Sequence, residues 1–109
     1  MLKSTTFRRH YLSMGCQCVK DENKWKEMVH DVLKRENIMP TPEHYKVLDL
    51  VRYFYLEKER APSVKEICEY NGLSFSEFFS LFPDWPHTLF IIDSIVAIVL
   101  DIPIWNVEI

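Results

Sequence analysis

Two capping-box sequences separated by a single turn signal constrain the fold of this chain more than any other feature. Ser63-Val64-Lys65-Glu66 and Ser74-Phe75-Ser76-Glu77 each place a serine three residues before a glutamate. At this spacing the two side chains satisfy backbone N–H groups that the first turn of a helix leaves without partners. Asn71-Gly72 lies between them and suits the left-handed end of a helix. The sequence therefore predicts two short helices, Val64–Tyr70 and Phe75–Phe82, joined as in a helix-turn-helix.

Three longer helices follow from apolar spacing and from proline. Within Lys24–Glu36 the apolar residues recur at the spacing of one helix face; they are Trp25, Met28, Val29, Val32 and Leu33. Thr41-Pro42 suits the N-cap and the first position of a helix over Pro42–Glu59. A last helix, His87–Leu100, is apolar nearly all round, so we expect it to be buried on several sides.

The first ~20 residues show no helical period. Thr5-Thr6-Phe7 has the composition of a strand, Met14-Gly15 suits a turn, and Cys16-Gln17-Cys18-Val19 alternates. This pattern favours a short N-terminal β-hairpin beside the helices. The predicted fold class is mainly α, with residues 1–109 forming one small helical domain that contains a helix-turn-helix.

Composition and charge indicate the class of the protein, its compartment and the partners that are disfavoured. Hydrophobic residues make up 48% of the chain and charged residues 27%, which is typical of a soluble globular domain. The formal net charge of −3 disfavours nucleic acid and anionic membranes as partners. Three cysteines, an odd number, argue against a disulfide framework and favour the reducing cytoplasm. The apolar run from Leu89 to Leu100 is shorter than the ~20 residues of a membrane-spanning helix, and the N-terminus lacks the apolar run of a signal peptide.

The helix-turn-helix leaves a DNA-binding transcriptional regulator as an alternative function. Its second helix, however, contains no lysine or arginine, the residues on which phosphate attraction and guanine recognition mainly depend. Packing is therefore the favoured use of the motif. A regulator would need a basic patch assembled from elsewhere in the chain, from Arg8, Arg9, Lys34, Arg35, Lys58 and Arg60.

Cys16 and Cys18 are the candidate reactive thiols, because they lie in an irregular segment flanked by cations. Cys68 falls on the apolar side of a short helix, where a buried structural thiol is expected. The pair Cys16-x-Cys18 has neither the spacing of a zinc site nor that of a thioredoxin-like motif. We find no catalytic set of residues and expect no metal, no cofactor and no enzymatic activity.

Several segments of the chain resemble the DsrC/TusE sulfur-relay family, which is also known as the gamma subunit of dissimilatory sulfite reductase. Trp25-x-x-x-Val29 looks like the first helix of that family. Ile38-x-x-Thr41-Pro42-Glu43-His44-Tyr45 is similar to its segment written I-x-L-[ST]-x-E-H-W, with tyrosine in place of tryptophan. Val51-Arg52-Tyr53-Phe54-Tyr55 resembles its arginine-bearing helix, and Ala61-Pro62 its helix break. The similarity runs from Trp25 to about Pro86.

The resemblance implies a divergent role in sulfur trafficking, as a sulfur-relay protein or a sulfite-reductase partner. His44, Tyr45 and Arg52 would then belong to the surface that binds a sulfite reductase or a sulfur transferase. Members of the family carry sulfur on a cysteine beside the C-terminus, whereas this sequence has no cysteine after Cys68. We therefore expect a role without the C-terminal persulfide chemistry, in which Cys16 or Cys18 is left as a candidate carrier.

The apolar character of His87–Leu100 also leads us to expect a homodimer. Residues three and four apart share a helix face, and both faces of this helix are apolar. The residues expected at the interface are Leu89, Ile92, Val96 and Val99.

Overall fold

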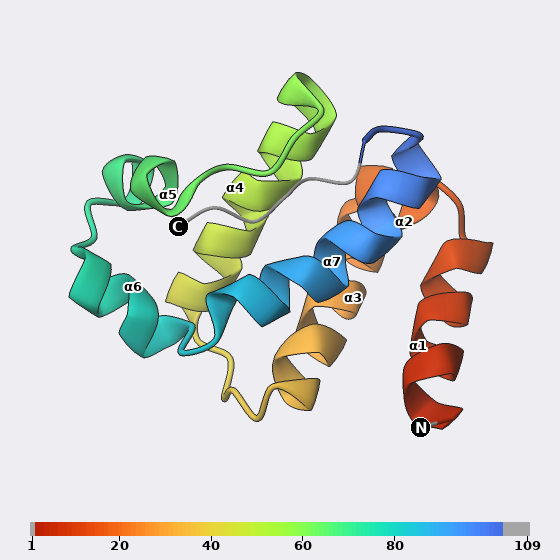
Figure 1. Cartoon of the computed structure of the whole chain (residues 1–109), viewed down its shortest axis with the longest axis horizontal. Helices are drawn as coiled ribbons and strands as arrows, with labels where there is room; N and C mark the ends of the chain where they lie inside the picture. The colour runs from red at the N-terminus through yellow and green to blue at the C-terminus, as the bar shows by residue number, and fades with distance from the viewer. Residues whose placement is uncertain (1, 104–109) are drawn as a thin grey trace.

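The computed structural model describes residues 2–103, and this part of the chain is almost entirely helical (Figure 1). Its helices are α1 (Leu2–Ser13), α2 (Gln17–Lys20), α3 (Glu22–Arg35), α4 (Pro42–Lys58), α5 (Val64–Asn71), α6 (Phe75–Leu81) and α7 (Trp85–Leu100). Residues 2–103 contain no β-strand. The mainly α fold class is therefore confirmed. The five predicted helices are confirmed as well, with ends that differ from the predicted ones by no more than two residues.

The predicted N-terminal β-hairpin is wrong, because α1 and α2 occupy that segment. The alternation in the sequence spans too few residues to specify a strand, and a helical spacing coexists with it. Phe7 and Tyr11 are four residues apart and share one helix face, where their ring centroids lie 5.2 Å apart. Tyr11 is fully buried, and its hydroxyl donates a hydrogen bond to Asp31 of α3. Packing against α3 thus stabilises the first helix.

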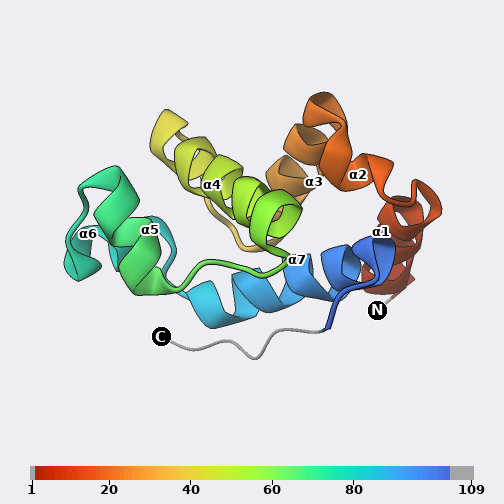
Figure 2. The ribbon, with the colours of Figure 1, turned by 90° about the horizontal axis from the view of Figure 1, so that it is seen from above.

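The other helices are arranged around α7. It runs lengthwise along one side of the molecule, with α3 and α4 on its inner side, α1 at one end and α5 and α6 at the other (Figure 2). Leu89, Ile92 and Val96 of α7 are buried within this single chain. These residues are therefore not available for the expected dimer interface, and Val99 is partly buried against the same core. One chain alone accounts for the burial of these residues.

A buried hydrogen bond joins α7 to α4. The Tyr55 hydroxyl donates to Asp93 Oδ1 at 2.7 Å, and both side chains are almost completely shielded from solvent. Burial, followed by the adjacent Asp93 carboxyl group, raises the pKa of Tyr55 well above its ordinary value. The hydroxyl therefore keeps its proton and remains a donor at neutral pH.

The two short helices form as their capping boxes predict. The Ser63 hydroxyl accepts from the Glu66 backbone N–H at 3.1 Å, and the Glu66 carboxylate accepts from the Ser63 backbone N–H at 2.8 Å. Ser74 and Glu77 repeat this exchange at 3.0 Å and 2.8 Å. Gly72 ends α5 with φ of 64°, a left-handed conformation that glycine adopts without steric cost.

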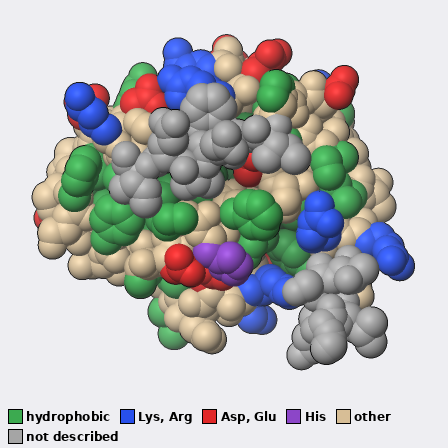
Figure 3. Space-filling view, viewed as in Figure 1, with side chains coloured by type: hydrophobic (Ala, Val, Ile, Leu, Met, Phe, Trp, Pro, Cys, Tyr) green, Lys and Arg blue, Asp and Glu red, His purple; other side chains and the backbone are tan. Residues whose placement is uncertain are grey.

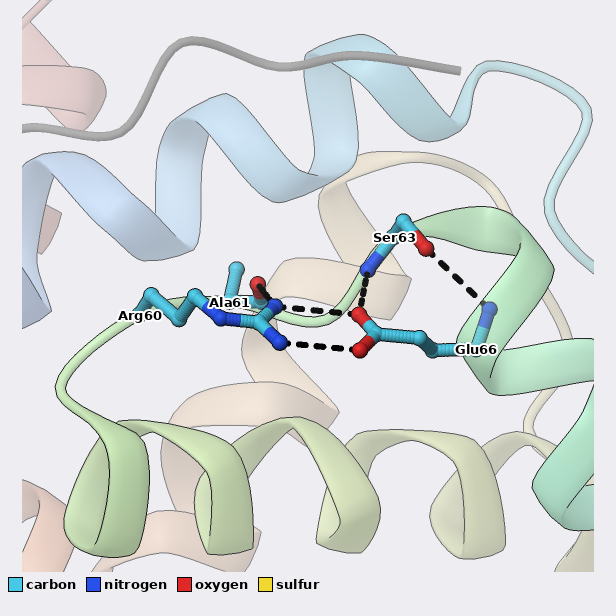
Figure 4. A network of polar contacts seen from close by, with 4 residues as sticks. All are labelled: Arg60, Ala61, Ser63 and Glu66. Carbon is cyan, nitrogen blue, oxygen red and sulfur yellow. Dashed lines mark hydrogen bonds and ion pairs between the residues drawn. The ribbon is translucent and has the colours of Figure 1, made fainter.

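The first capping box carries an additional arginine, which ties the end of α4 to the start of α5. Arg60 donates to both oxygens of Glu66, at 3.0 Å and 2.8 Å, so that one carboxylate binds the guanidinium and the Ser63 backbone together (Figure 4). These bonds, those from Arg60 first, lower the pKa of Glu66 from 4.5 to about 2.

Within the described residues, no single helix is long and apolar enough to cross a membrane. The pair α6 and α7 reaches the required length and composition only with a 65° bend between the two helices.

The Arg60–Glu66 pair gives a pH-dependent prediction. Glu66→Gln keeps an oxygen that can accept from Ser63 but removes the charge that Arg60 binds. We expect it to lower the free energy of unfolding by about 1 kcal/mol, since the pair is one-third exposed. The folded-state pKa is depressed, so this stabilisation is fully present above pH 4.5 and is lost as the pH falls towards about 2.

Urea unfolding measured from neutral pH to pH 2 checks this expectation. Glu77→Gln is the matched control, because it removes the same charge from the second capping box, and we expect a loss of about 0.5 kcal/mol or less from the helix dipole. Equal losses for the two variants at neutral pH would show that Arg60 contributes nothing.

Candidate functional site

The three thiols differ sharply in their access to solvent. Cys16 is the N-cap residue of α2 and is partly exposed. Cys18 is fully buried, and burial, with the nearby Cys16 second, raises the pKa of its thiol to about 11. Cys68 is buried, as its helix position predicts, and burial followed by Glu77 raises its pKa. The thiolate is the reactive form, and burial with a raised pKa disfavours it at Cys18 and Cys68. Cys16 is therefore the thiol that we expect to react.

The short helix that carries Cys16 is held from α4 by one arginine. Arg52 Nε donates to the Val19 carbonyl at 2.6 Å, and Arg52 Nη2 donates to the Lys20 carbonyl at 2.9 Å. Carbonyl groups in the last turn of a helix have no partner within the helix, so Arg52 supplies the missing donors. Asp21 follows at once and caps α3 by accepting from the Asn23 and Lys24 backbone N–H groups. Arg52 therefore fixes the position of the segment that contains Cys16.

His44 is also a tie between helices. The side chain is buried, and Nδ1 accepts from the Thr41 backbone N–H at 3.1 Å while Nε2 donates to the Leu81 carbonyl at 2.8 Å. These two bonds require the tautomer with its proton on Nε2. The ring also packs edge to face on Phe82, with centroids 5.0 Å apart. His44 thus joins the start of α4 to the end of α6.

Tyr45, the third residue of the family-like surface, is partly buried and lies beside α3. Its hydroxyl is 3.0 Å from His30 Nδ1. Taken together, His44, Tyr45 and Arg52 connect α4 to three different neighbours. All three side chains are engaged within the chain, and Tyr45 and Arg52 also keep partial exposure to solvent.

The described part of the chain brings no metal-binding set around the cysteines. His10 lies 3.6 Å from Glu27 of α3, and His30 contacts Tyr45. Within residues 2–103, the group of three metal-capable side chains that converge is Glu36, Asp84 and His87, which includes neither cysteine. No local sequence signal marks this group, because its members lie at the ends of two helices far apart in the chain.

An open groove follows the outer side of α7. It has a volume of about 600 Å³ and is lined from α1, α3 and α7; its lining includes Phe7, Arg35, Glu36, His87 and Phe90. A second hollow of about 460 Å³ shares Phe7 and Arg35 and extends between α1 and α3. Phe90 and Ile98 of α7 are more than half exposed beside this groove, so apolar surface is available to a partner there.

Arg52 gives a prediction about thiol reactivity. In a short pulse of iodoacetamide under native conditions, Cys16 should be alkylated first, with Cys18 and Cys68 protected by burial. Arg52→Met removes two charge-assisted hydrogen bonds from α2, so Cys18 should become accessible more often. We expect its labelling to speed up roughly 10-fold, since one such bond contributes ~1.5 kcal/mol or more.

Peptide mass spectrometry measures the labelling at each cysteine. Arg9→Met is the control, because it removes an exposed arginine of α1, and it should leave all three rates unchanged. Preferential labelling of Cys68 in the unmodified protein would refute the assignment, and an unchanged Cys18 rate in Arg52→Met would show that Arg52 does not hold α2.

Comparison with known proteins identifies a family that the sequence matches. Residues 15–90, from the turn before α2 into the first turns of α7, match the sequence model of the family described as DsrC like protein. Sulfurtransferase TusE of Shigella dysenteriae serotype 1 and of Escherichia coli K12 are each 30% identical to this chain over 76 residues, covering 62% of this chain and 70% of the relative. No solved structure matches the chain. The matched residues include the Cys16 segment, the α4 ties and the α5–α6 pair, and the chain belongs to the DsrC-like family.

Proposed function

We propose that this protein works in sulfur trafficking, as a divergent member of a sulfur relay that acts by binding another protein. The observation that carries the proposal is the family match, which spans most of the helical body. The relatives bear the name sulfurtransferase, and we extend to this chain a role as relay protein rather than as enzyme. The expected partner is a sulfite reductase or a sulfur transferase, and the expected compartment is the cytoplasm.

The carrier we propose within these 109 residues is Cys16. The family's C-terminal cysteine has no counterpart after Cys68 in this sequence. Cys16 is the most exposed of the three thiols and sits on a segment that Arg52 anchors. In the proposed step, the Cys16 thiolate attacks the outer sulfur of a donor persulfide. A new S–S bond forms on Cys16, the S–S bond of the donor breaks, and the donor cysteine leaves as a thiolate, with no net oxidation.

Transfer from a persulfidated sulfur-transferase protein tests the proposal directly. The full chain should gain the mass of one sulfur atom on the peptide that contains Cys16. Cys16→Ser should abolish the gain, whereas Cys68→Ser, the matched control for loss of a thiol, should retain it. Sulfur found on Cys68, or no sulfur on any cysteine of a folded protein, would contradict Cys16 as the carrier.

The alternative of a DNA-binding regulator is not favoured. The exposed side of α6 presents Phe75 and Glu77 in place of basic residues. Arg60 is engaged with Glu66, and Lys58 lies over the Phe54 ring. The ends of α3 and α4, which carry or adjoin four of the six cations of such a basic patch, lie at opposite sides of the molecule (Figure 1). These two pairs do not share the single basic face that duplex binding requires.

A homodimer remains a prediction, and it now depends on different residues. The exposed apolar side chains of α7 are Phe90 and Ile98, at 58% and 54% exposure. We expect light scattering in the micromolar range to give a dimer, and the double substitution Phe90→Glu and Ile98→Glu to give a folded monomer. Tyr70→Glu, at an exposed aromatic of α5, is the control and should leave the dimer intact. A monomer for the unmodified protein would rule the dimer out.

A further inference from the structure

Three side chains with metal-binding atoms converge where α3 ends and α7 begins. They are Glu36, Asp84 and His87, whose ligand atoms all lie within 4.8 Å of one another. His87 Nδ1 is 3.0 Å from Glu36 Oε2, across 51 positions of sequence. Acidic and histidine side chains meet on the face of the molecule that shows α7 (Figure 3). The group also borders the 600 Å³ groove, because Glu36 and His87 belong to its lining.

The Asp84 side chain is not used as its position would suggest. Asp84 is the N-cap residue of α7, where an aspartate ordinarily accepts hydrogen bonds from backbone N–H groups of the first turn. Here its side chain makes no such bond, although its backbone carbonyl accepts from the His87 and Thr88 N–H groups. The carboxylate instead faces the Glu36 carboxylate within 4.8 Å. Two like charges at this distance repel each other, and a cation between them removes the repulsion.

Glu36 lies at a helix end where a nearby cation is favourable. It is the C-cap residue of α3, at the negative end of the helix dipole, and its side chain is only 11% exposed. Its carboxylate accepts from the Thr88 hydroxyl at 3.1 Å and contacts the His87 ring. Neither Thr88 nor His87 carries a fixed positive charge; the arginines that line the same groove are Arg8 and Arg35.

We propose that Glu36, Asp84 and His87 bind a divalent transition-metal ion of the zinc type. Two carboxylates and an imidazole suit Zn²⁺, whereas Mg²⁺ and Ca²⁺ prefer oxygen ligands alone. Ligand atoms around tetrahedral zinc lie about 3.3 Å apart, so the exposed Asp84 and His87 side chains need only a small closing movement. Thr88 orients Glu36 from outside the ligand set. Three protein ligands leave a fourth position for water or for an anionic group in the groove.

The ion would join two helices that are distant in sequence, and so would stabilise the fold. α3 and α7 are both central to the core, and this group lies at their junction. Because the ion binds the folded chain and not the dispersed ligands of the unfolded one, zinc should raise the melting temperature. The inference does not depend on the sulfur-relay proposal, since it involves none of the cysteines.

Calorimetric titration of the full chain with Zn²⁺, in competition with a chelator, tests the site. The titration uses a Cys16→Ser background, so that the accessible thiol cannot bind the ion. We expect one ion per chain and a higher melting temperature. His87→Ala and Glu36→Gln should each weaken binding at least ~10-fold, and Thr88→Val, which keeps the shape of the side chain, roughly 10- to 100-fold.

His10→Ala is the matched control, because His10 forms an exposed pair with Glu27 at 3.6 Å, and it should leave binding unchanged. Circular dichroism verifies that each variant is folded. The proposal is overturned if adding His87→Ala to the Cys16→Ser protein leaves zinc binding as tight as before, or if zinc fails to raise the melting temperature of the Cys16→Ser protein. If the unmodified protein binds zinc and the Cys16→Ser protein does not, the ion belongs to the thiol instead.

Discussion

The burial of α7 is the constraint on which the rest of the structure depends. Its inner residues Leu89, Ile92 and Val96 are buried, and the helix packs on α1 and α3. Complete burial of one such side chain stabilises the folded state by about 1.5–3 kcal/mol. The inward face of α7 carries the Asp93 carboxylate, and the Tyr55 hydroxyl donates a hydrogen bond to it. Because a buried polar group without this bond would destabilise the fold, the bond favours the observed orientation of α7. α1 and α3 pack directly on α7, whereas α2 and α5 are placed by their contacts with α3 and α4.

The residues that carry the family resemblance act mainly as ties between helices. His44 joins α4 to the end of α6, and Arg52 joins α4 to the end of α2. α4 therefore holds both the segment that contains Cys16 and the helix-turn-helix. The motif residues at these two positions therefore have a structural role in placing other segments of the chain.

Local sequence signals predict their helices correctly in this chain. Each of these signals concerns a single helix, and each such helix forms as predicted. The signals are the two capping boxes, Thr41-Pro42 and the apolar stripe from Trp25 to Leu33. The prediction for the N-terminus was wrong, because a strand-like alternation coexists there with the helical spacing of Phe7 and Tyr11. The contact of Tyr11 with α3, which no local pattern reveals, favours the helix. The hydrogen bond from Arg52 to the Val19 carbonyl joins residues 33 positions apart, and the Glu36–His87 contact joins residues 51 positions apart. No periodicity in the sequence reveals such distant contacts. Likewise, the apolar character of α7 predicts burial but cannot tell whether a second subunit supplies it.

Sulfur relay through Cys16 is the central claim of this account, and the state of that thiol in the cell tests it most directly. The protein can be isolated from its native cells with free thiols and persulfides blocked at lysis, and its peptides analysed by mass spectrometry. The account predicts that a fraction of the Cys16 peptide carries one additional sulfur atom, while the Cys18 and Cys68 peptides carry none. A Cys16 peptide without added sulfur, during active sulfur metabolism that loads other relay proteins in the same cells, would contradict it.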